Sequence, residues 1–271
     1  MMTVNAAHTL FSLKSTNILI TGGGTGLGYA MAEAYLQQGA RVLLASRREA
    51  VLSDAVVTLT NTYGAERVAY VCMDMACQIS IEQALPKIWT WGEIDVLVNN
   101  AGRVHNADLL TLDASSWDDV NAVNIKGVWL LSRALVSRFN ERIDRGNSAT
   151  QGLSIINVTS ILGMAHMIRA GLYGMSKASL IYLTKQMALE WSEYGVRVNA
   201  IEPGFVYTDM TDELLQSRLS DALLKHVPMA RFGVVEDVCG VAVLLASRAS
   251  AYMTGSVIPV DGGHSIAQVM S

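Results

Sequence analysis

The sequence from Asn17 to Gly28 reads Asn17-Ile-Leu-Ile-Thr-Gly-Gly-Gly-Thr-Gly-Leu-Gly28, a short apolar run followed at once by a glycine-rich turn. An apolar, β-branched run of this length is typical of a strand buried on both faces of a parallel sheet. The next segment, Leu27 to Gln38, has helical periodicity and ends before Gly39, a suitable helix C-cap. Strand, glycine turn and helix in this order indicate a site for a dinucleotide pyrophosphate at the helix N-terminus.

The glycines of this turn allow a tight bend and a close approach of the backbone to a phosphate group. A glycine motif alone is weak evidence, but its place between a strand and a helix makes it specific. We therefore predict that the turn contributes five residues to a cofactor site: Gly22, Thr25, Gly26, Leu27 and Gly28.

The alternation of strands and helices continues along the chain. Further strands are expected at 41–46, 68–73, 96–99, 153–159, 197–201 and 256–260, and helices at 49–63, 79–89, 124–144, 237–247 and from Tyr173 to about 194. Pro86 should kink or end the helix in which it lies. Because the sequence has no linker, repeat or low-complexity tract, we predict one domain over residues 1–271. Its fold class is α/β, a doubly wound parallel sheet (Rossmann fold) of seven strands with helices on both faces.

The composition, with 51% hydrophobic and 16% charged residues, indicates a globular protein with a large core. A net charge of -4 without long basic runs argues against nucleic acid or an anionic membrane as partner. Neither a secretory signal pattern nor an apolar run of about 18 residues is present, so we expect a cytoplasmic protein. The 3 Cys and 5 His are scattered, which predicts neither a disulfide framework nor a metal site.

Two arginines follow the second expected strand. An acidic side chain at the end of this strand would bind the adenosine ribose hydroxyls, whereas an arginine accommodates a 2'-phosphate. The acidic position is taken by Ser46, and Arg47 and Arg48 come next. We therefore predict NADP(H) as the cofactor. The alternative is that both arginines are solvated residues at the start of the next helix.

The ends of the third and fourth strands supply further candidates at the same edge of the sheet. Asp74, followed by Met75, lies where a carboxylate would accept a hydrogen bond from an adenine amine. Small residues after the fourth strand, in the run Asn100-Ala-Gly102, permit close approach to a ring system. The alternative role of this second group is to turn the chain.

Candidate acid and base groups occur between Ser160 and Lys177. Tyr173 and Lys177 are four residues apart, so on a helix they share one face, and the ammonium would lower the pKa of the phenol from about 10. A phenol with a lowered pKa is a usable general acid and base. Ser160, after the strand 153–159, could hydrogen-bond the same substrate oxygen.

Two features remain open at this level. Asn124 lies in the apolar middle of a long helical pattern, where a buried amide requires partners; it bends the helix, holds a water or is satisfied locally. The irregular segment 205–232 is an expected substrate lid, with an amphipathic patch near 214–224.

Taken together, these residues resemble the short-chain dehydrogenase/reductase family along nearly the whole chain. The resemblance rests on five motifs in the family's order and spacing: Thr21-Gly-x-x-x-Gly-x-Gly28, Asn99-Asn-Ala-Gly102, Ser160 thirteen residues before Tyr173, Tyr173-x-x-x-Lys177, and Pro203-Gly204 with Thr208 downstream.

The resemblance implies an NADP(H)-dependent oxidoreductase that acts on a carbonyl or secondary alcohol. Its catalytic residues would be Asn124, Ser160, Tyr173 and Lys177, with Tyr173 as the acid, Ser160 on the substrate oxygen, Lys177 on the cofactor ribose and Asn124 binding a relay water. Pro203, Gly204, Val206 and Thr208 would bind the nicotinamide side. Family members are usually homotetramers built through two long helices and the last strand. Thr25 stands where many NADP-dependent members carry a basic residue, so NAD remains the alternative cofactor.

The substrate is not defined by the sequence. Met164, Met167, Met175, Met210 and Met229 are consistent with an adaptable apolar pocket or with ordinary core packing. Four basic side chains lie near the expected mouth of the pocket: Arg103, His105, His166 and Arg169. They could bind an anionic group of the substrate, or they could be ordinary surface residues. The overall likeness is to 3-oxoacyl reductases and to sugar-acid or general carbonyl reductases. Alternatives are an NAD-linked alcohol dehydrogenase and a nucleotide-binding sensor without turnover.

Overall fold

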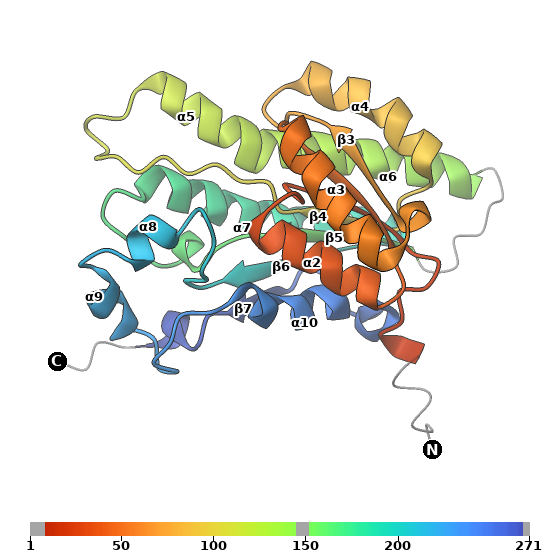
Figure 1. The fold of residues 1–271 in the computed structure, drawn as a ribbon. Helices are drawn as coiled ribbons and strands as arrows, with labels where there is room; N and C mark the ends of the chain where they lie inside the picture. Colours follow the sequence, from red (N-terminus) through yellow and green to blue (C-terminus); the bar gives the residue numbers. More distant parts are fainter. Residues whose placement is uncertain (1–8, 145–151, 268–271) are drawn as a thin grey trace.

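The structure, a computed structural model, describes residues 9–144 and 152–267. Its centre is a parallel sheet of seven strands in the order β3-β2-β1-β4-β5-β6-β7 (Figure 1). The predicted fold class is therefore confirmed. The strands are β1 (Asn17–Thr21), β2 (Arg41–Ser46), β3 (Val68–Cys72), β4 (Val96–Asn99), β5 (Leu153–Val158), β6 (Val196–Pro203) and β7 (Val257–Val260).

Helices cover both faces of the sheet, because successive residues of each buried strand point to opposite sides. Ile18 and Ile20 of β1 pack into one core and Leu19 packs into the other. The first core contains side chains from α2 (Gly26–Gln37), α3 (Glu49–Tyr63) and α10 (Val235–Ala246). The second contains side chains from α4 (Gln78–Trp91), α6 (Val128–Asp144) and α7 (Gly171–Trp191).

The order of the strands reverses direction at β1, which pairs with β2 on one side and with β4 on the other. Thr21, the last residue of β1, is in register with Ala45 of β2 and Asn99 of β4. The chains that leave these strands turn to opposite faces, which opens a crevice outside their carboxyl ends. The predicted site residues converge at this edge.

Pro86 does not end the helix in which it lies. The helix α4 continues through it to Trp91. A proline removes the hydrogen bond to the carbonyl four residues earlier, here that of Glu82. Both residues are exposed, so water can satisfy this carbonyl.

The helical pattern around Asn124 consists of three parts. The helix α5 (Ala114–Asn121) passes into a π-helical turn (Ala122–Gly127) and then into α6. A π turn carries one more residue per hydrogen-bonded ring than an α-helix, so the helix is interrupted at the anomalous amide.

The segment 205–232 contains two short helices, α8 (Asp212–Leu215) and α9 (Ser220–Leu224), at the edge of the molecule beyond the carboxyl end of β6 (Figure 1). Its base is held by a bridge between Val206 and Gly233 and by an ion pair of 2.7 Å between Arg231 and Asp237. Within the described residues, every helix is too short or too polar to cross a bilayer.

Candidate active site

A cavity of about 350 Å³ opens at the carboxyl edge of the sheet. Residues that follow each of the strands β1 to β6 line it, so its walls come from both halves of the fold. The predicted residues that reach it are Gly22, Thr25, Gly26, Leu27, Ser46, Arg47, Arg48, Asp74, Met75, Asn100, Ala101, Gly102, Ser160, Tyr173, Lys177, Pro203, Gly204, Val206 and Thr208. Gly28 and Asn124 lie behind the wall.

The glycine turn is shaped to hold a phosphate group. Gly22 and Gly26 have φ angles of 66° and 54°, in the left-handed region that favours glycine. A Cβ on Gly28 would lie 2.3 Å from the carbonyl oxygen of Gly22, so this third glycine lets the helix pack against the turn. Thr25, the N-cap of α2, makes no side-chain capping bond within the described part of the chain. The first amide groups of α2 are therefore suited to bind an anion.

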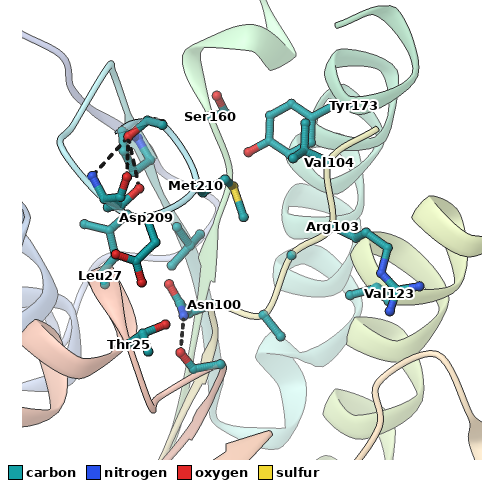
Figure 2. Close-up of a pocket in the computed structure, with 18 of the residues that line it drawn as sticks. Thr25, Leu27, Asn100, Arg103, Val104, Val123, Ser160, Tyr173, Asp209 and Met210 are labelled. Atoms are coloured by element: carbon teal, nitrogen blue, oxygen red, sulfur yellow. Dashed lines mark hydrogen bonds between the residues drawn. The ribbon is translucent and has the colours of Figure 1, made fainter. Parts of the chain in front are cut away.

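Asn100 fixes the glycine turn to the end of β4. Its side-chain amide donates to the carbonyl oxygens of Thr21 and Gly22, both at 3.1 Å, and Figure 2 shows Asn100 between the turn and the cavity. The hydroxyl of Thr21 accepts from the backbone amides of Asn100 at 3.1 Å and Ala101 at 3.0 Å. Asn100 thus shapes the cofactor cradle through the backbone.

The end of β2 supplies the groups expected to read the adenosine phosphate. Ser46 Oγ is buried and has no hydrogen-bond partner among the described residues. Arg47 and Arg48 line the cavity beside it. A buried hydroxyl with unused bonding capacity next to two guanidinium groups fits a ribose carrying a 2'-phosphate. Asp74 also lines this end, and one of its oxygens accepts from the Ala76 amide at 2.9 Å.

Ser160 and Tyr173, the predicted catalytic hydroxyls, lie together in the wall of the cavity. Ser160 follows β5 and caps a short 3-10 turn by accepting from the Leu162 amide at 3.2 Å. Tyr173 lies in the first turn of α7, and Figure 2 shows its phenol oxygen on the same side of the cavity as Ser160. Burial raises the pKa of Tyr173 to about 12, although a hydrogen bond with Ser160 acts to lower it.

Lys177 lies one turn further along α7, as its spacing predicts. Its Nζ donates to the carbonyl oxygen of Val158 at 2.7 Å and lies 5.5 Å from the centroid of the Tyr173 ring. Burial lowers the pKa of this ammonium group to about 8. The expected lowering of the phenol pKa is not found in this structure, because desolvation of Tyr173 outweighs the groups around it. A Cβ on Gly102 would lie 3.6 Å from Nζ, so glycine leaves the space in front of the lysine open.

Asn124 is satisfied by local partners. Its Oδ1 accepts from the Arg103 amide at 2.8 Å, and its Nδ2 donates to the Arg103 carbonyl and to Ser176 Oγ, both at 2.9 Å. Ser176 in turn donates to the Tyr173 carbonyl at 2.7 Å. The amide therefore ties the chain after β4 to the helix that carries Tyr173 and Lys177. Its two amide hydrogens are both used in this way.

The chain after β6 forms the opposite wall, and a residue that the sequence analysis missed organises it. Thr211 Oγ1 donates to the Val206 carbonyl at 2.5 Å and lies 3.1 Å from Thr208 Oγ1. It also accepts from the Thr208 amide at 3.0 Å. A hydroxyl three residues after Thr208, at the start of a short helix, was the available signal.

Of the four basic residues considered for the mouth, Arg103 is the one that lines the cavity within the described ranges. Its guanidinium pairs with Asp119 of α5 and, in Figure 2, points towards that helix and away from Tyr173. Burial, and then the nearby Arg47, lower the pKa of Arg103. Arg103 thus adds positive charge near the arginines after β2, while its own contacts are made with protein groups.

Comparison with known proteins agrees with this geometry. A family model described as Enoyl-(Acyl carrier protein) reductase matches residues 22–265. Together with the sheet order, the glycine turn and the Ser160, Tyr173 and Lys177 group, this shows that the chain belongs to the short-chain dehydrogenase/reductase family of oxidoreductases.

Particular relatives fall into two groups of activity. The 2-dehydro-3-deoxy-D-gluconate 5-dehydrogenase of Escherichia coli is 35% identical over 93% of this chain and 96% of its own length. The 3-oxoacyl-[acyl-carrier-protein] reductase of Thermotoga maritima is also 35% identical, over 93% of this chain and 98% of its own. A crystal structure of a gluconate 5-dehydrogenase from Burkholderia cenocepacia, in complex with NADP and tartrate, has a TM-score of 0.88 and 29% identity, covering 97% of this chain and all of that one.

Proposed function

We propose that this protein transfers hydride between NADP(H) and the carbon of a ketone or 3-oxoacyl group, or of the corresponding secondary alcohol. The observation that carries the proposal is one continuous cavity with a phosphate-binding glycine turn at one end and the Ser160 and Tyr173 hydroxyls at the other. Arg47 and the unpartnered Ser46 hydroxyl support NADP over NAD. The NADP complex of the Burkholderia relative supports it further.

The protein's own groups would handle the proton. The bound nicotinamide supplies or accepts the hydride. Ser160 would donate its hydrogen bond to the substrate oxygen and hold it beside the Tyr173 phenol, which carries its proton at neutral pH because its pKa is about 12. As the oxygen gains negative charge, the phenol would give up this proton. Lys177, still protonated below about pH 8, would stabilise the phenolate that forms.

The remaining predicted cofactor contacts are proposed from the positions of the residues in the cavity wall. Pro203, Gly204, Val206 and Thr208 line the wall facing the Asn100 segment and are proposed to bind the nicotinamide side. Asn124 is proposed as a positioning residue, because it holds the Arg103 backbone against Ser176 of α7. A water bound near this π turn would complete a proton path to Lys177.

We also propose that residues 205–232 close over the substrate and that the protein forms a homotetramer. Met210 and Leu214 of this segment line the cavity, which is what a lid requires. Large apolar side chains are exposed on α6 and α7, among them Trp129 at 39%, Tyr182 at 71% and Leu189 at 73%. In the proposed tetramer these side chains would be covered by neighbouring subunits. Light scattering that gives a monomer mass would refute the tetramer.

A screen that follows NADPH absorbance tests the activity. It should contain aliphatic ketones, 3-oxoacyl thioesters and keto-sugar acids, each with NADPH and NADH. We expect consumption of NADPH with at least one carbonyl class. Tight NADPH binding without turnover on any class would favour the nucleotide-binding sensor, and faster turnover with NADH would favour the NAD-linked dehydrogenase.

A further inference from the structure

The lining at the substrate end of the cavity is mostly apolar, with the polar side chains of Asn106, Ser160 and Thr208 among it. Three separate segments contribute it: the chain after β4, the loop between β5 and α7, and the segment 205–232. The apolar side chains concerned are Val104, Ile161, Leu162, Met167, Ala170, Phe205, Met210 and Leu214. Val104 and Met210 line the same cavity as Tyr173, and in the view of Figure 2 they are drawn around its side chain, so hydrocarbon and thioether groups contribute to the wall at this end.

The basic residues of the cavity are not placed to receive a substrate carboxylate. Within the described ranges they are Arg47, Arg48, Arg103 and Lys177. The first two follow β2, which is separated from the Ser160 strand β5 by β1 and β4, a distance of about 14 Å across three strand spacings. Arg103 is paired with Asp119, and Lys177 donates to Val158.

The acidic residues of the lining lie at the cofactor end: Asp74 follows β3, and Figure 2 shows Asp209 on the side of the glycine turn. They therefore do not decide the charge of the substrate. The other basic candidates of the sequence, His105, His166 and Arg169, are absent from the lining that the described residues form. A carboxylate moved into this end would lose its hydration without gaining a cation, which is costly.

Further apolar side chains are exposed on two of the segments that line the cavity. Leu109, Met164 and Ile168 lie in the two loops that follow β4 and β5, where His105, His166 and Arg169 are exposed as well. The backbone amide of Ala107 donates to the Arg169 carbonyl at 3.1 Å, so these loops are joined. A substrate chain longer than the inner pocket would therefore keep apolar contact as it leaves. The methionines can adapt to chains of different shape.

On the basis of the proposed function, we infer that the substrate is an uncharged carbonyl compound, or its alcohol, with an apolar chain of several carbons beside the reacting carbon. Sugar acids, the substrates in the names of several relatives, are poor substrates for this chain. The cavity would bind the apolar chain of the substrate by burying it, so kcat/KM should rise with each methylene group that is buried.

A matched pair of substrates tests the charge. Ethyl 3-oxohexanoate and 3-oxohexanoate share the chain and the reacting ketone, and only the second carries a carboxylate. We expect kcat/KM with NADPH to be at least about 100-fold higher for the ester: the two carbons of its ethyl group account for about tenfold, and the rest arises because its uncharged end needs no cation. 5-Keto-D-gluconate should be poorer than both.

A homologous series of esters tests whether the cavity favours substrates with a longer apolar chain. From ethyl 3-oxobutanoate upward, kcat/KM should rise by about three- to fourfold per methylene, the change that corresponds to about 0.8 kcal/mol per buried CH₂ group, until the chain leaves the cavity. Leu214→Arg places a cation in the wall and should lower kcat/KM for the esters and raise it for 3-oxohexanoate. Ile79→Arg makes the same change on an exposed part of α4 and should alter neither.

The outcomes separate this inference from the function on which it rests. Preference for 5-keto-D-gluconate or free 3-oxohexanoate over the esters would overturn the apolar substrate class and leave the NADPH-linked oxidoreductase standing. A flat response to chain length would also overturn it. Absence of turnover on every carbonyl compound, in protein that binds NADPH, would overturn both.

Discussion

The two ends of the cavity are built in different ways. At the adenosine end, the lining consists of backbone atoms and short side chains held at strand ends, such as the Gly22 turn and Ser46, together with the guanidinium groups of Arg47 and Arg48. At the substrate end, most of the wall is made by long apolar side chains, such as Met167 and Leu214, on segments between strands and helices.

This difference shows that the fold determines the cofactor end of the cavity, whereas the substrate end can be adapted to a particular substrate. The sheet edge dictates the first end, because a turn between a buried strand and a helix must use glycine to approach a phosphate. The second end can change its side chains without disturbing the sheet, since loops tolerate such change. One scaffold can therefore keep its cofactor while its substrate changes.

Tyr173→Phe should have the largest effect, and it should affect the substrate end of the cavity without affecting the cofactor end. We expect kcat to fall by about 10²- to 10⁴-fold if the phenol supplies the proton as we propose. The Kd for NADPH, measured by fluorescence titration, should change little. Tyr182→Phe, on an exposed part of the same helix, is the matched control and should keep normal rates. Near-normal turnover in Tyr173→Phe would refute the acid role.

The double variant Ser46→Asp with Arg47→Ile acts at the adenosine end. A carboxylate there would repel a 2'-phosphate and bind ribose hydroxyls, so the ratio of kcat/KM for NADPH over NADH should fall by about 100-fold. Arg248→Ile removes an exposed arginine far from the cavity lining and should leave the ratio unchanged. An unchanged ratio in the double variant would mean that the phosphate is read elsewhere.

The pH dependence of reduction tests Lys177. Its pKa of about 8 means that the ammonium loses its proton as pH rises through 8, while Tyr173, with a pKa of about 12, keeps its own. We expect kcat/KM to be level below pH 8 and to fall by about tenfold per pH unit above it. Lys177→Met should lose this limb along with most activity, and Lys185→Met, exposed on the same helix, should keep it. A wild-type profile without a limb near pH 8 would contradict this role.

Gly28→Ala should give the smallest effect, on stability. Its Cβ would meet the Gly22 carbonyl at 2.3 Å, and forcing this contact costs about 1–3 kcal/mol. The melting temperature should drop by roughly 2–4 °C per kcal/mol, and NADPH binding should weaken. Gly240→Ala in α10 meets nothing within 4 Å and should raise the melting temperature, because alanine favours the helix. Equal melting temperatures for the two variants would show that close packing at Gly28 is unimportant.

The sequence predicted the strands, the glycine turn and the Tyr173 and Lys177 spacing, because each depends on local periodicity or chain geometry. It failed where tertiary surroundings decide. The helix α4 continues through Pro86 on its exposed face, and the pKa of Tyr173 is raised because the packing around it desolvates the phenol. Neither effect is encoded in neighbouring residues.

The substrate end was the least predictable part of the site. The methionines could not be divided between core and cavity, and Arg103 could not be assigned a direction until its partner Asp119 was known. Thr211 acts through three-dimensional contacts with Val206 and Thr208. Side-chain direction in loops depends on contacts between segments that are distant in sequence.

The π turn at Ala122–Gly127 also sets the rotational phase between two helices. One surplus residue advances the helical wheel by about 100°, so α5 and α6 present different faces along one nearly continuous rod. Val120, before the π turn, is buried, and Val123, within the turn, lines the cavity. Leu131 and Leu135, after the turn, pack on the sheet. Deleting one residue here would restore regular winding and turn either the cavity wall or the core face towards solvent. The length of this turn therefore sets which side chains reach the cavity and which reach the core.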